Sequence, residues 1–316
     1  MVSLYRWTNS LGTRILLRGL KRAVRATPED VASETFQRRI DGFLVAPGKR
    51  RKIVLEISGH QYRLRGRTRK NGSFYGALKL PNEVAPLPDG ETRVVDMNLR
   101  RSTDNLGTIS PTTGQIYVVK SRGVSVISDI DDTIKLTEAT SKKQMLTNTF
   151  LRPFEVVAGM STLYQDWAAG GCDFHYVSSS PWQLYESLAE LCSDSQFPAG
   201  SMHLRYFRVR DEMFKRFRPL RRNAKVAIIV RIIKALPQRR FVLVGDSGEQ
   251  DPEIYRFLAK RFPSQVAAIL IRNLSVRPLS LKRIRKLASI EKQVFIKIFE
   301  QPDDIADIVP NILNGD

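Results

Sequence analysis

The chain has 316 residues, of which 42% are hydrophobic, so it is long enough to form two domains with separate apolar cores. No apolar stretch approaches the ~20 residues that a membrane-spanning helix needs, and Arg14, Arg18 and Arg22 interrupt any apolar signal sequence near the N-terminus. The two cysteines, Cys172 and Cys192, exclude a disulfide framework and have no metal-ligand spacing. We predict that both are reduced and packed, as in a cytoplasmic protein.

The charge of the chain is strongly basic, because 51 Lys and Arg residues outnumber 32 Asp and Glu residues and give a formal net charge of +19. Such a surface attracts polyanions, and both nucleic acid and an anionic membrane have the required charge. No nucleic-acid-binding motif is recognisable, so nucleic acid is not expected as a partner. The alternative explanation of the charge is general solubility.

Residues 1–37 are predicted to form a basic, amphipathic helical segment. Leu4, Trp7, Leu11 and Ile15 can share one face of a helix while arginines lie opposite. Such a helix could lie on a membrane surface, and packing against a neighbouring domain is the alternative.

Residues 38–120 are predicted to form a small antiparallel β-sandwich domain. Alternating apolar and polar residues occur at 52–57, 61–65 and 115–119. Turn signals such as Pro47-Gly48 and Asn71-Gly72 separate these runs, and Asn71-Gly72 is the strongest hairpin signal in the chain.

Residues 121–316 are predicted to form a doubly wound domain, because strand-like and helix-like patterns alternate. Beyond the three strands that carry the motifs below, strands are expected at 202–207, 266–271 and 293–298. Helices are expected at 155–169, 181–193, 223–235 and 252–262.

The most informative motif of this domain is a β-branched run that ends in two acids, Asp129 and Asp131. Residues i and i+2 of a strand point the same way, so both carboxylates face one crevice if the extended geometry persists. One of them could then attack a substrate while the other moves protons, as phosphoryl transfer requires. The alternative for an isolated Asp-x-Asp pair is a strand followed by an Asx turn.

A second apolar run ends in three serines followed by Pro181. Proline is tolerated in a first helical turn, so Ser180 is expected to cap a helix and Ser178 to lie beside its N-terminus. Backbone N–H groups and a hydroxyl that converge there could bind a phosphoryl group.

A third apolar run places Asp246 at a strand tip and Asp251 on the following loop. Carboxylates clustered in this way suit Mg²⁺, which prefers hard oxygen ligands. Between the second and third runs, Lys225 lies near the start of an apolar helix, where a cation is unusual because the helix dipole favours anions. Lys225 is therefore a candidate phosphate clamp, with a solvated helix end as the alternative.

In chain order, these acids, hydroxyls and lysine resemble the four motifs of the haloacid dehalogenase (HAD) superfamily of aspartate-dependent phosphatases. The residues of these motifs resemble one branch more closely still, the catalytic domain of the actin-patch type phosphatidate phosphatases. Four segments carry this resemblance: Ile127–Lys135, Tyr176–Leu184, Phe197–Leu204 and Val242–Glu249. The likeness covers residues 120–275, and four long motifs in order are far more specific than any one alone.

The resemblance implies a role for each matching residue. Asp129 would be the nucleophile that forms an aspartyl phosphate, and Asp131 the general acid that protonates the leaving alkoxide and then activates water. Thr133 would orient this loop at the substrate, whereas Asp132 is expected to be a turn or supporting residue. The implied Mg²⁺ ligands are Asp129, the backbone carbonyl of Asp131, and Asp246, with Asp251 either as a further ligand or as a residue that supports the ligands.

The resemblance also implies that Ser178 and Lys225 hold the phosphate oxygens that are not transferred. Ser179 is the alternative to Ser178, because a single sequence does not fix where the strand ends. None of the three histidines is assigned to catalysis, and His175 is expected to be a buried, hydrogen-bonded core residue.

The sequence therefore predicts an α/β protein with a HAD-like, doubly wound (Rossmannoid) parallel sheet preceded by a small antiparallel β-sandwich. It predicts a Mg²⁺-dependent phosphomonoesterase, with phosphatidate as the substrate by resemblance. The alternatives are a phosphatase of a soluble phosphosugar or phosphoprotein, and a non-catalytic basic adaptor for membrane or nucleic acid. The basic run 205–222 is expected to contact an anionic membrane or the substrate headgroup, unless it is only a solvated loop.

Overall fold

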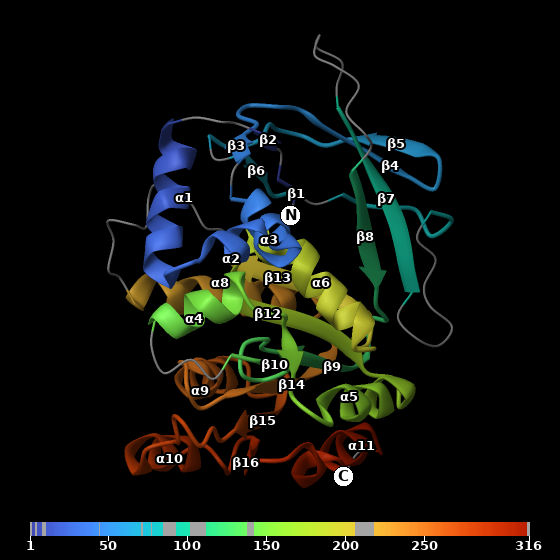
Figure 1. Cartoon of the computed structure of the whole chain (residues 1–316). Helices are drawn as coiled ribbons and strands as arrows, with labels where there is room; N and C mark the ends of the chain where they lie inside the picture. Colours follow the sequence, from blue (N-terminus) through green and yellow to red (C-terminus); the bar gives the residue numbers. More distant parts are fainter. Residues whose placement is uncertain are drawn as a thin grey trace. The chain divides into compact units, whose positions relative to one another are not determined.

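The computed structural model describes residues 2–3, 5–7, 11–43, 45–70, 72–76, 78–84, 93–101, 112–137, 142–205 and 218–314 (Figure 1). The chain divides into two compact units, one formed by residues 1–20 and 40–119 and the other by residues 21–39 and 120–316. The predicted domain boundaries at 37/38 and 120/121 stay predictions. In the part of the chain that the structure describes, no helix is long and apolar enough to cross a bilayer.

The first unit is built on a four-stranded antiparallel sheet in the order β5-β4-β7-β8, so the predicted antiparallel character of this region is confirmed. In β4, every second residue is buried, as expected for a strand with one face on a core. Two short antiparallel pairs, β1-β6 and β2-β3, complete the described strands of this unit. The eight strands are β1 (Val2–Ser3), β2 (Tyr5–Trp7), β3 (Val45–Pro47), β4 (Ile53–Ile57), β5 (His60–Arg63), β6 (Ser73–Phe74), β7 (Arg93–Arg101) and β8 (Thr112–Val118).

The two-residue turn between β4 and β5 is formed by Ser58 and Gly59, which both have positive φ angles of 48° and 79°. This backbone geometry matches the twist of a hairpin. The predicted hairpin residue Asn71 lies outside the described residues.

The second unit contains a six-stranded sheet in which all strands are parallel, in the order β13-β12-β9-β14-β15-β16. Its strands are β9 (Gly123–Ser128), β12 (Asp173–Pro181), β13 (Gly200–Arg205), β14 (Arg239–Asp246), β15 (Val266–Arg272) and β16 (Phe295–Phe299). The chain starts in the middle with β9, adds two strands on one side and then three on the other. The prediction of a doubly wound parallel sheet is thus confirmed, and the strand order reverses between β9 and β14.

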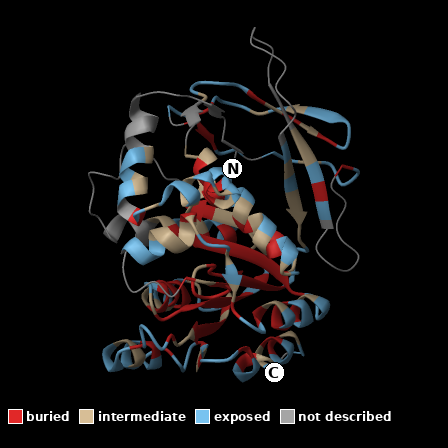
Figure 2. Ribbon diagram, viewed as in Figure 1, coloured by how far each residue is buried: buried red, intermediate tan, exposed pale blue. Residues whose placement is uncertain are grey.

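Helices cover both faces of this sheet. On one face, α8 and α9 pack on β12, β13, β14 and β15, and their apolar residues share a core with those of α10. Elsewhere, α5 contacts η2 and α11 contacts β9. Figure 2 shows that the buried residues gather along the strands of this sheet. The helices are α4 (Lys142–Phe150), α5 (Met160–Ala169), η1 (Trp182–Leu184), α6 (Tyr185–Asp194), α8 (Arg218–Ala235), α9 (Asp251–Arg261), α10 (Leu281–Ala288), η2 (Pro302–Ile305) and α11 (Ile308–Asn314).

Two predicted helix starts were wrong. The helix expected from residue 155 begins at Met160, because β11 (Glu155–Val156) pairs with β10 (Lys135–Leu136) and Gly159 then turns the chain with a φ of 79°. The helix expected from residue 181 begins later, because β12 continues through Pro181 and a 3₁₀ turn precedes α6. The other predicted helices are present, with α8 starting five residues before the predicted position 223.

The N-terminal segment contains α1 (Leu11–Val24), α2 (Pro28–Ala32) and α3 (Glu34–Asp41). Its predicted helical character is confirmed over these ranges, although β1 and β2 precede α1. The predicted apolar face of this segment, and residues 206–217 of the basic run, lie outside the described residues and side chains.

Candidate active site

Polar residues follow the carboxyl ends of three neighbouring strands of the parallel sheet. Asp129 comes directly after β9, and Asp246 ends β14. Ser178 and Ser180 are among the last four residues of β12. The Asp129 N–H donates to the Val244 carbonyl at 2.9 Å, which joins the ends of β9 and β14. This is the point where the strand order reverses, and it is where open α/β sheets bind ligands.

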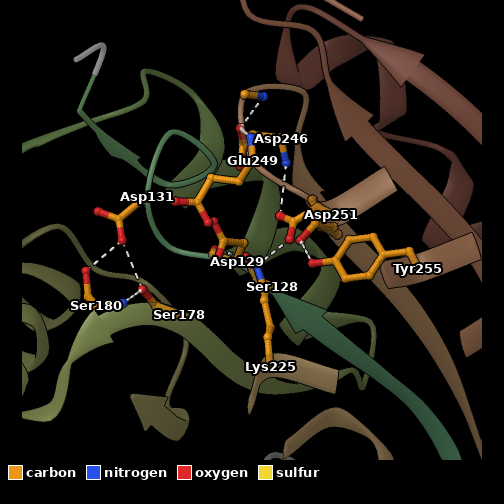
Figure 3. Close-up of polar contacts among 12 residues, drawn as sticks. Ser128, Asp129, Asp131, Ser178, Ser180, Lys225, Asp246, Glu249, Asp251 and Tyr255 are labelled. Carbon is orange, nitrogen blue, oxygen red and sulfur yellow. Dashed lines mark hydrogen bonds and ion pairs between the residues drawn. The ribbon is translucent and has the colours of Figure 1, made fainter. Parts of the chain in front are cut away.

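Three of the predicted metal ligands form a buried acidic cluster. Asp129, Asp246 and Asp251 are 1%, 0% and 0% exposed, and each offers a carboxylate oxygen within 4.8 Å of the others. Figure 3 shows Asp251 directed from α9 toward the ends of β9 and β14. Gly245 makes this approach possible, since a Cβ atom at that position would collide with the Asp251 carboxylate.

Lys225 lies in the same cluster. Its Nζ is 2.6 Å from Asp129 Oδ1 and 2.5 Å from Asp251 Oδ1, and the lysine is 3% exposed. The ammonium therefore neutralises part of the charge of the acidic cluster and does not lie at a solvated helix end. Burial alone would disfavour the charged lysine, but the Asp129 and Asp251 carboxylates outweigh it and raise the pKa of Lys225.

Asp129 and Asp246 resist ionisation. Burial, which the neighbouring carboxylates reinforce, raises the pKa of Asp129 well above its ordinary value, although Lys225 opposes the shift. Burial and the Asp251 charge likewise raise the pKa of Asp246. Removal of carboxylates from water and their mutual repulsion both favour the neutral form. A cation placed among them would reverse this effect.

Two oxygens of the cluster have no partner among the described residues. Asp129 Oδ2 and Asp246 Oδ2 are buried and make no hydrogen bond, whereas Asp246 Oδ1 accepts from the N–H groups of Gly248 and Glu249 at 2.5 and 3.1 Å. Unpaired buried carboxylate oxygens are costly. The orphaned oxygens and the all-carboxylate donor set therefore fit a hard divalent cation.

Asp131 belongs to a second network, and its carboxylate is bound on both sides. Oδ2 accepts hydrogen bonds from Ser178 at 2.9 Å and Ser180 at 2.7 Å, and Oδ1 forms an ion pair with Lys135 at 2.7 Å. Figure 3 shows the Asp131 carboxylate directed to the two serines. Burial opposes ionisation, but the Lys135 charge and the serine hydroxyls together lower the pKa of Asp131 to about 2.

The chain is not extended through both Asp129 and Asp131. The condition under which both carboxylates would face one crevice is therefore not met. Strand β9 ends at Ser128, and the N–H groups of Ile134 and Lys135 both donate to the Ile130 carbonyl at 3.0 and 2.9 Å. This tight turn sends the two carboxylates into different hydrogen-bond networks. Asp132 lies in the turn with a φ of 57° and accepts from the Thr137 N–H at 2.6 Å, which confirms it as a turn residue.

The structure corrects the expected role of Ser180. It does not cap a helix, because Pro181 precedes the 3₁₀ turn, and its hydroxyl instead donates to Asp131. Ser178 and Ser180 both reach Asp131, while the Ser179 carbonyl accepts from Arg205 Nε at 3.1 Å. The alternation of a strand would have indicated this pairing of Ser178 with Ser180.

Other predicted residues are placed as follows. Thr133 is fully buried, and its hydroxyl has no partner among the described residues. His175 is buried and hydrogen-bonded to Ser201 at 2.6 Å, as predicted, and both cysteines are buried and free. Lys135 was not predicted as a site residue, because its contact with Asp131 depends on the tight turn between them.

Residues 124–273 match a family model described as the catalytic domain of phosphatidate phosphatase APP1. Phosphatidate phosphatase APP1 of Saccharomyces cerevisiae is 32% identical over 252 residues, which is 77% of this chain and 41% of the yeast protein. An uncharacterized protein of Schizosaccharomyces pombe is 31% identical over 184 residues, or 57% of this chain and 30% of that protein. The chain thus spans less than half the length of the curated relatives that it matches.

Proposed function

We propose that the chain belongs to the catalytic-domain family of phosphatidate phosphatase APP1, whose model matches residues 124–273, and that it is a phosphomonoesterase that hydrolyses phosphatidate to diacylglycerol and phosphate. The observation that carries the proposal is the buried cluster of three acids and one lysine with two unpaired carboxylate oxygens. A structural cluster would have satisfied these oxygens. We further infer a HAD-like architecture, which the strand order and the reversal point support.

In the first step, Asp129 attacks the phosphorus atom of the substrate. A bond forms between its carboxylate oxygen and phosphorus while the bond to the ester oxygen breaks, which leaves an aspartyl phosphate and an alkoxide. Lys225 holds Oδ1 of Asp129 at 2.6 Å, whereas Oδ2 has no partner among the described residues. Lys225 thereby fixes the orientation of the nucleophile.

Asp131 serves as the proton donor to the leaving oxygen and then as the base that takes a proton from the attacking water. In the free protein it is ionised, since its pKa is about 2. A bound phosphate dianion raises that pKa by charge repulsion, and Asp131 takes up from solvent the proton that it then gives to the leaving oxygen. Rotation of the Ser178 hydroxyl from Asp131 to the phosphate would remove one hydrogen bond that stabilises the carboxylate.

The non-transferring phosphate oxygens are held by Ser178, Thr133 and Lys225, and Ser179 remains the alternative to Ser178. Thr133 has a buried hydroxyl without a partner among the described residues, so it has a donor to offer. A divalent cation, which we propose to be Mg²⁺ held by Asp129, Asp246, Asp251 and the Asp131 backbone carbonyl, would supply positive charge that offsets the repulsion between carboxylate and phosphate.

The test is phosphate release from a panel of phosphomonoesters in the presence of Mg²⁺. Phosphatidate in mixed micelles should be hydrolysed faster than a phosphosugar, a phosphopeptide or an aryl phosphate. A higher specificity constant for a soluble ester would overturn phosphatidate as the substrate, and the absence of release from every ester would overturn the enzyme proposal.

The role of Asp131 has its own test within the same panel. Asp131→Asn removes the proton donor, so the rate on phosphatidate should fall strongly. An aryl phosphate with an acidic leaving group needs no protonation, and its loss should be clearly smaller. Equal losses on the two substrates would contradict the acid role.

A further inference from the structure

The loop after β15 lies at the same edge of the sheet as the candidate active site. Leu274 forms a bridge with Arg277 and donates its N–H to Ser247 Oγ at 2.8 Å. Ser247 Oγ in turn donates to the Arg277 carbonyl at 2.7 Å. Because Ser247 directly follows Asp246, this loop is fixed to one acid of the site.

Helix α10 is fixed to the same place by Arg283. Its guanidinium pairs with Glu253 at 2.8 Å and donates to the carbonyls of Ser247 and Glu249 at 2.5 and 2.6 Å. Figure 1 shows α10 beside α9, whose first residue is Asp251. Arg283 lies in the first turn of α10, so its bond to the Ser247 carbonyl places this turn, which begins at Leu281, near the carboxyl end of β14.

The outer face of this segment combines apolar and basic side chains. Val276 and Leu281 are 43% and 71% exposed, and Leu281 is the most exposed large apolar residue in the described part of the chain. No acidic residue occurs from position 273 to position 290. The same stretch contains five basic residues, four of which are exposed: Arg277, Lys282, Arg285 and Lys286.

We propose that this surface docks the protein on an anionic lipid bilayer. We call it the α10 rim, defined by Val276, Arg277, Leu281, Lys282, Arg285 and Lys286. The proposal rests on the proposed function, because a lipid phosphomonoester is presented at a bilayer surface. Basic side chains are attracted to anionic headgroups, and an exposed leucine can enter the interface between them.

Charge favours this occupant over a second copy of the chain. Two α10 rims facing each other would bring their basic residues together without any acid from the same stretch, and like charges in an interface are destabilising. An anionic membrane has the opposite charge. The rim is also held rigidly by Arg283 and Ser247, so a docked bilayer would face the site in a fixed orientation.

The experiment compares two triple variants of the full chain. The rim variant is Leu281→Ser with Lys282→Gln and Arg285→Gln. Its matched control, Phe295→Ser with Lys260→Gln and Lys292→Gln, removes one exposed apolar and two exposed basic side chains near the amino ends of the strands. Binding to phosphatidylserine-containing vesicles is measured by sedimentation, and folding is checked by thermal unfolding.

We expect the rim variant to bind these vesicles at least about 20-fold more weakly, since each basic residue near an anionic surface contributes about fivefold. The control should bind as the wild type does. Hydrolysis of phosphatidate in vesicles should fall in the rim variant, while hydrolysis of a short-chain phosphatidate dissolved as monomers should not change.

Undiminished vesicle binding by the rim variant, or equal losses in both variants, would overturn the proposal. So would a rim variant that changes only the oligomeric state seen in analytical ultracentrifugation. Rim-dependent vesicle binding by a protein that does not hydrolyse phosphatidate would overturn the proposed function alone. Phosphatidate hydrolysis with rim-independent vesicle binding would overturn the docking surface alone.

Discussion

Buried charges occur at both edges of the parallel sheet, but they are hydrogen-bonded completely at one edge and incompletely at the other. At the amino edge, Arg239 is 1% exposed and begins β14. Its Nε donates to Ser125 Oγ, Nη1 donates to the carbonyls of Lys120 and Arg122, and Nη2 contacts the Val124 carbonyl and the Asp173 carboxylate. Every N–H group of this guanidinium therefore has an acceptor.

At the carboxyl edge, the acids are equally buried but incompletely paired. Asp129 Oδ2 and Asp246 Oδ2 have no partner in the described part of the chain, and the pKa values of both residues are raised, chiefly by burial. A buried charge that is fully hydrogen-bonded stabilises one structure, whereas one that is left unpaired costs free energy until a ligand completes it. Complete pairing thus marks Arg239 as a structural charge, whereas the two unpaired oxygens mark the carboxyl edge as a binding site.

The largest expected effect is on catalysis, from Asp129→Asn. The amide keeps the shape of the side chain and an oxygen for Lys225, but it removes the attacking oxygen. Phosphate release should fall by at least about 10³-fold, while thermal unfolding shows a folded protein.

The matched control for Asp129→Asn is Asp173→Asn at the amino edge. It weakens the partner of Arg239, so it should lower stability and leave the rate per folded molecule unchanged. Wild-type-like turnover by Asp129→Asn would contradict the proposed nucleophile.

The second prediction concerns the unpaired oxygens as cation ligands. At a concentration 100-fold above its dissociation constant, Mg²⁺ should raise the free energy of unfolding of the wild type by about 2.7 kcal/mol. Its unfolding temperature should rise accordingly. Asp246→Ala should lose most of this stabilisation, because it removes one of the two orphaned oxygens.

Chelation by EDTA should abolish hydrolysis, and added Mg²⁺ should restore it. Direct binding by titration calorimetry provides a readout that does not depend on activity. Full turnover in EDTA, or unchanged cation binding by Asp246→Ala, would contradict the assignment of the cluster as a metal site.

The third prediction tests the structural edge. Arg239→Met removes the guanidinium that pairs with the buried Asp173 carboxylate and donates to several carbonyls, so the free energy of unfolding should fall by about 3–5 kcal/mol. The turnover number should be unchanged at a temperature where the variant is folded. Denaturant unfolding combined with phosphate release measures both. A stable Arg239→Met variant, or one that is folded and inactive, would remove the distinction between the edges.

Much of the site could be predicted because it lies at strand ends. Each of β9, β12 and β14 is a short apolar run that ends in polar residues. Asp129, Ser178 and Asp246 could therefore be assigned to one sheet edge from the sequence alone. The placement of Lys225 beside Asp129 needed the resemblance, since helix periodicity alone equally allows a solvated end.

What could not be predicted depends on local backbone geometry and on contacts distant in sequence. Pro181 indicates a helix start as readily as a strand end, and this ambiguity hid the role of Ser180. Lys135 reaches Asp131 only because the chain turns at Asp132 with a positive φ. Arg239 has no local signal at all, because its acceptors belong to Asp173 and to residues 120–125, which lie far earlier in the chain.

The smallest expected effect comes from His175, which is the exception to the comparison. It lies in β12 nearer the amino edge, and its Nδ1 meets Ser201, yet Nε2 is buried and has no partner among the described residues. Burial, helped by the His203 and Arg239 charges, lowers the pKa of His175 to about 3. Leaving a neutral ring nitrogen without a hydrogen bond costs far less free energy than leaving a buried carboxylate unpaired. The unpaired Nε2 of His175 therefore indicates that stability is sensitive to acid, and it does not indicate a ligand site.

The sign of that sensitivity follows from the two pKa values. Between pH 6.5 and pH 3 the unfolded chain binds a proton on His175 and the folded protein does not, so stability is present above pH 6.5 and is lost as the pH falls. At pH 5 the loss from this group is about 2 kcal/mol relative to pH 7. His175→Gln cannot take up a proton, so its stability difference from the wild type should shift in its favour by about that amount between pH 7 and pH 5. Denaturant unfolding of the wild type and of His175→Gln at the two pH values measures this shift. Parallel pH curves for wild type and His175→Gln would show that the pKa of His175 is the same in the folded and unfolded chain, and would contradict this prediction.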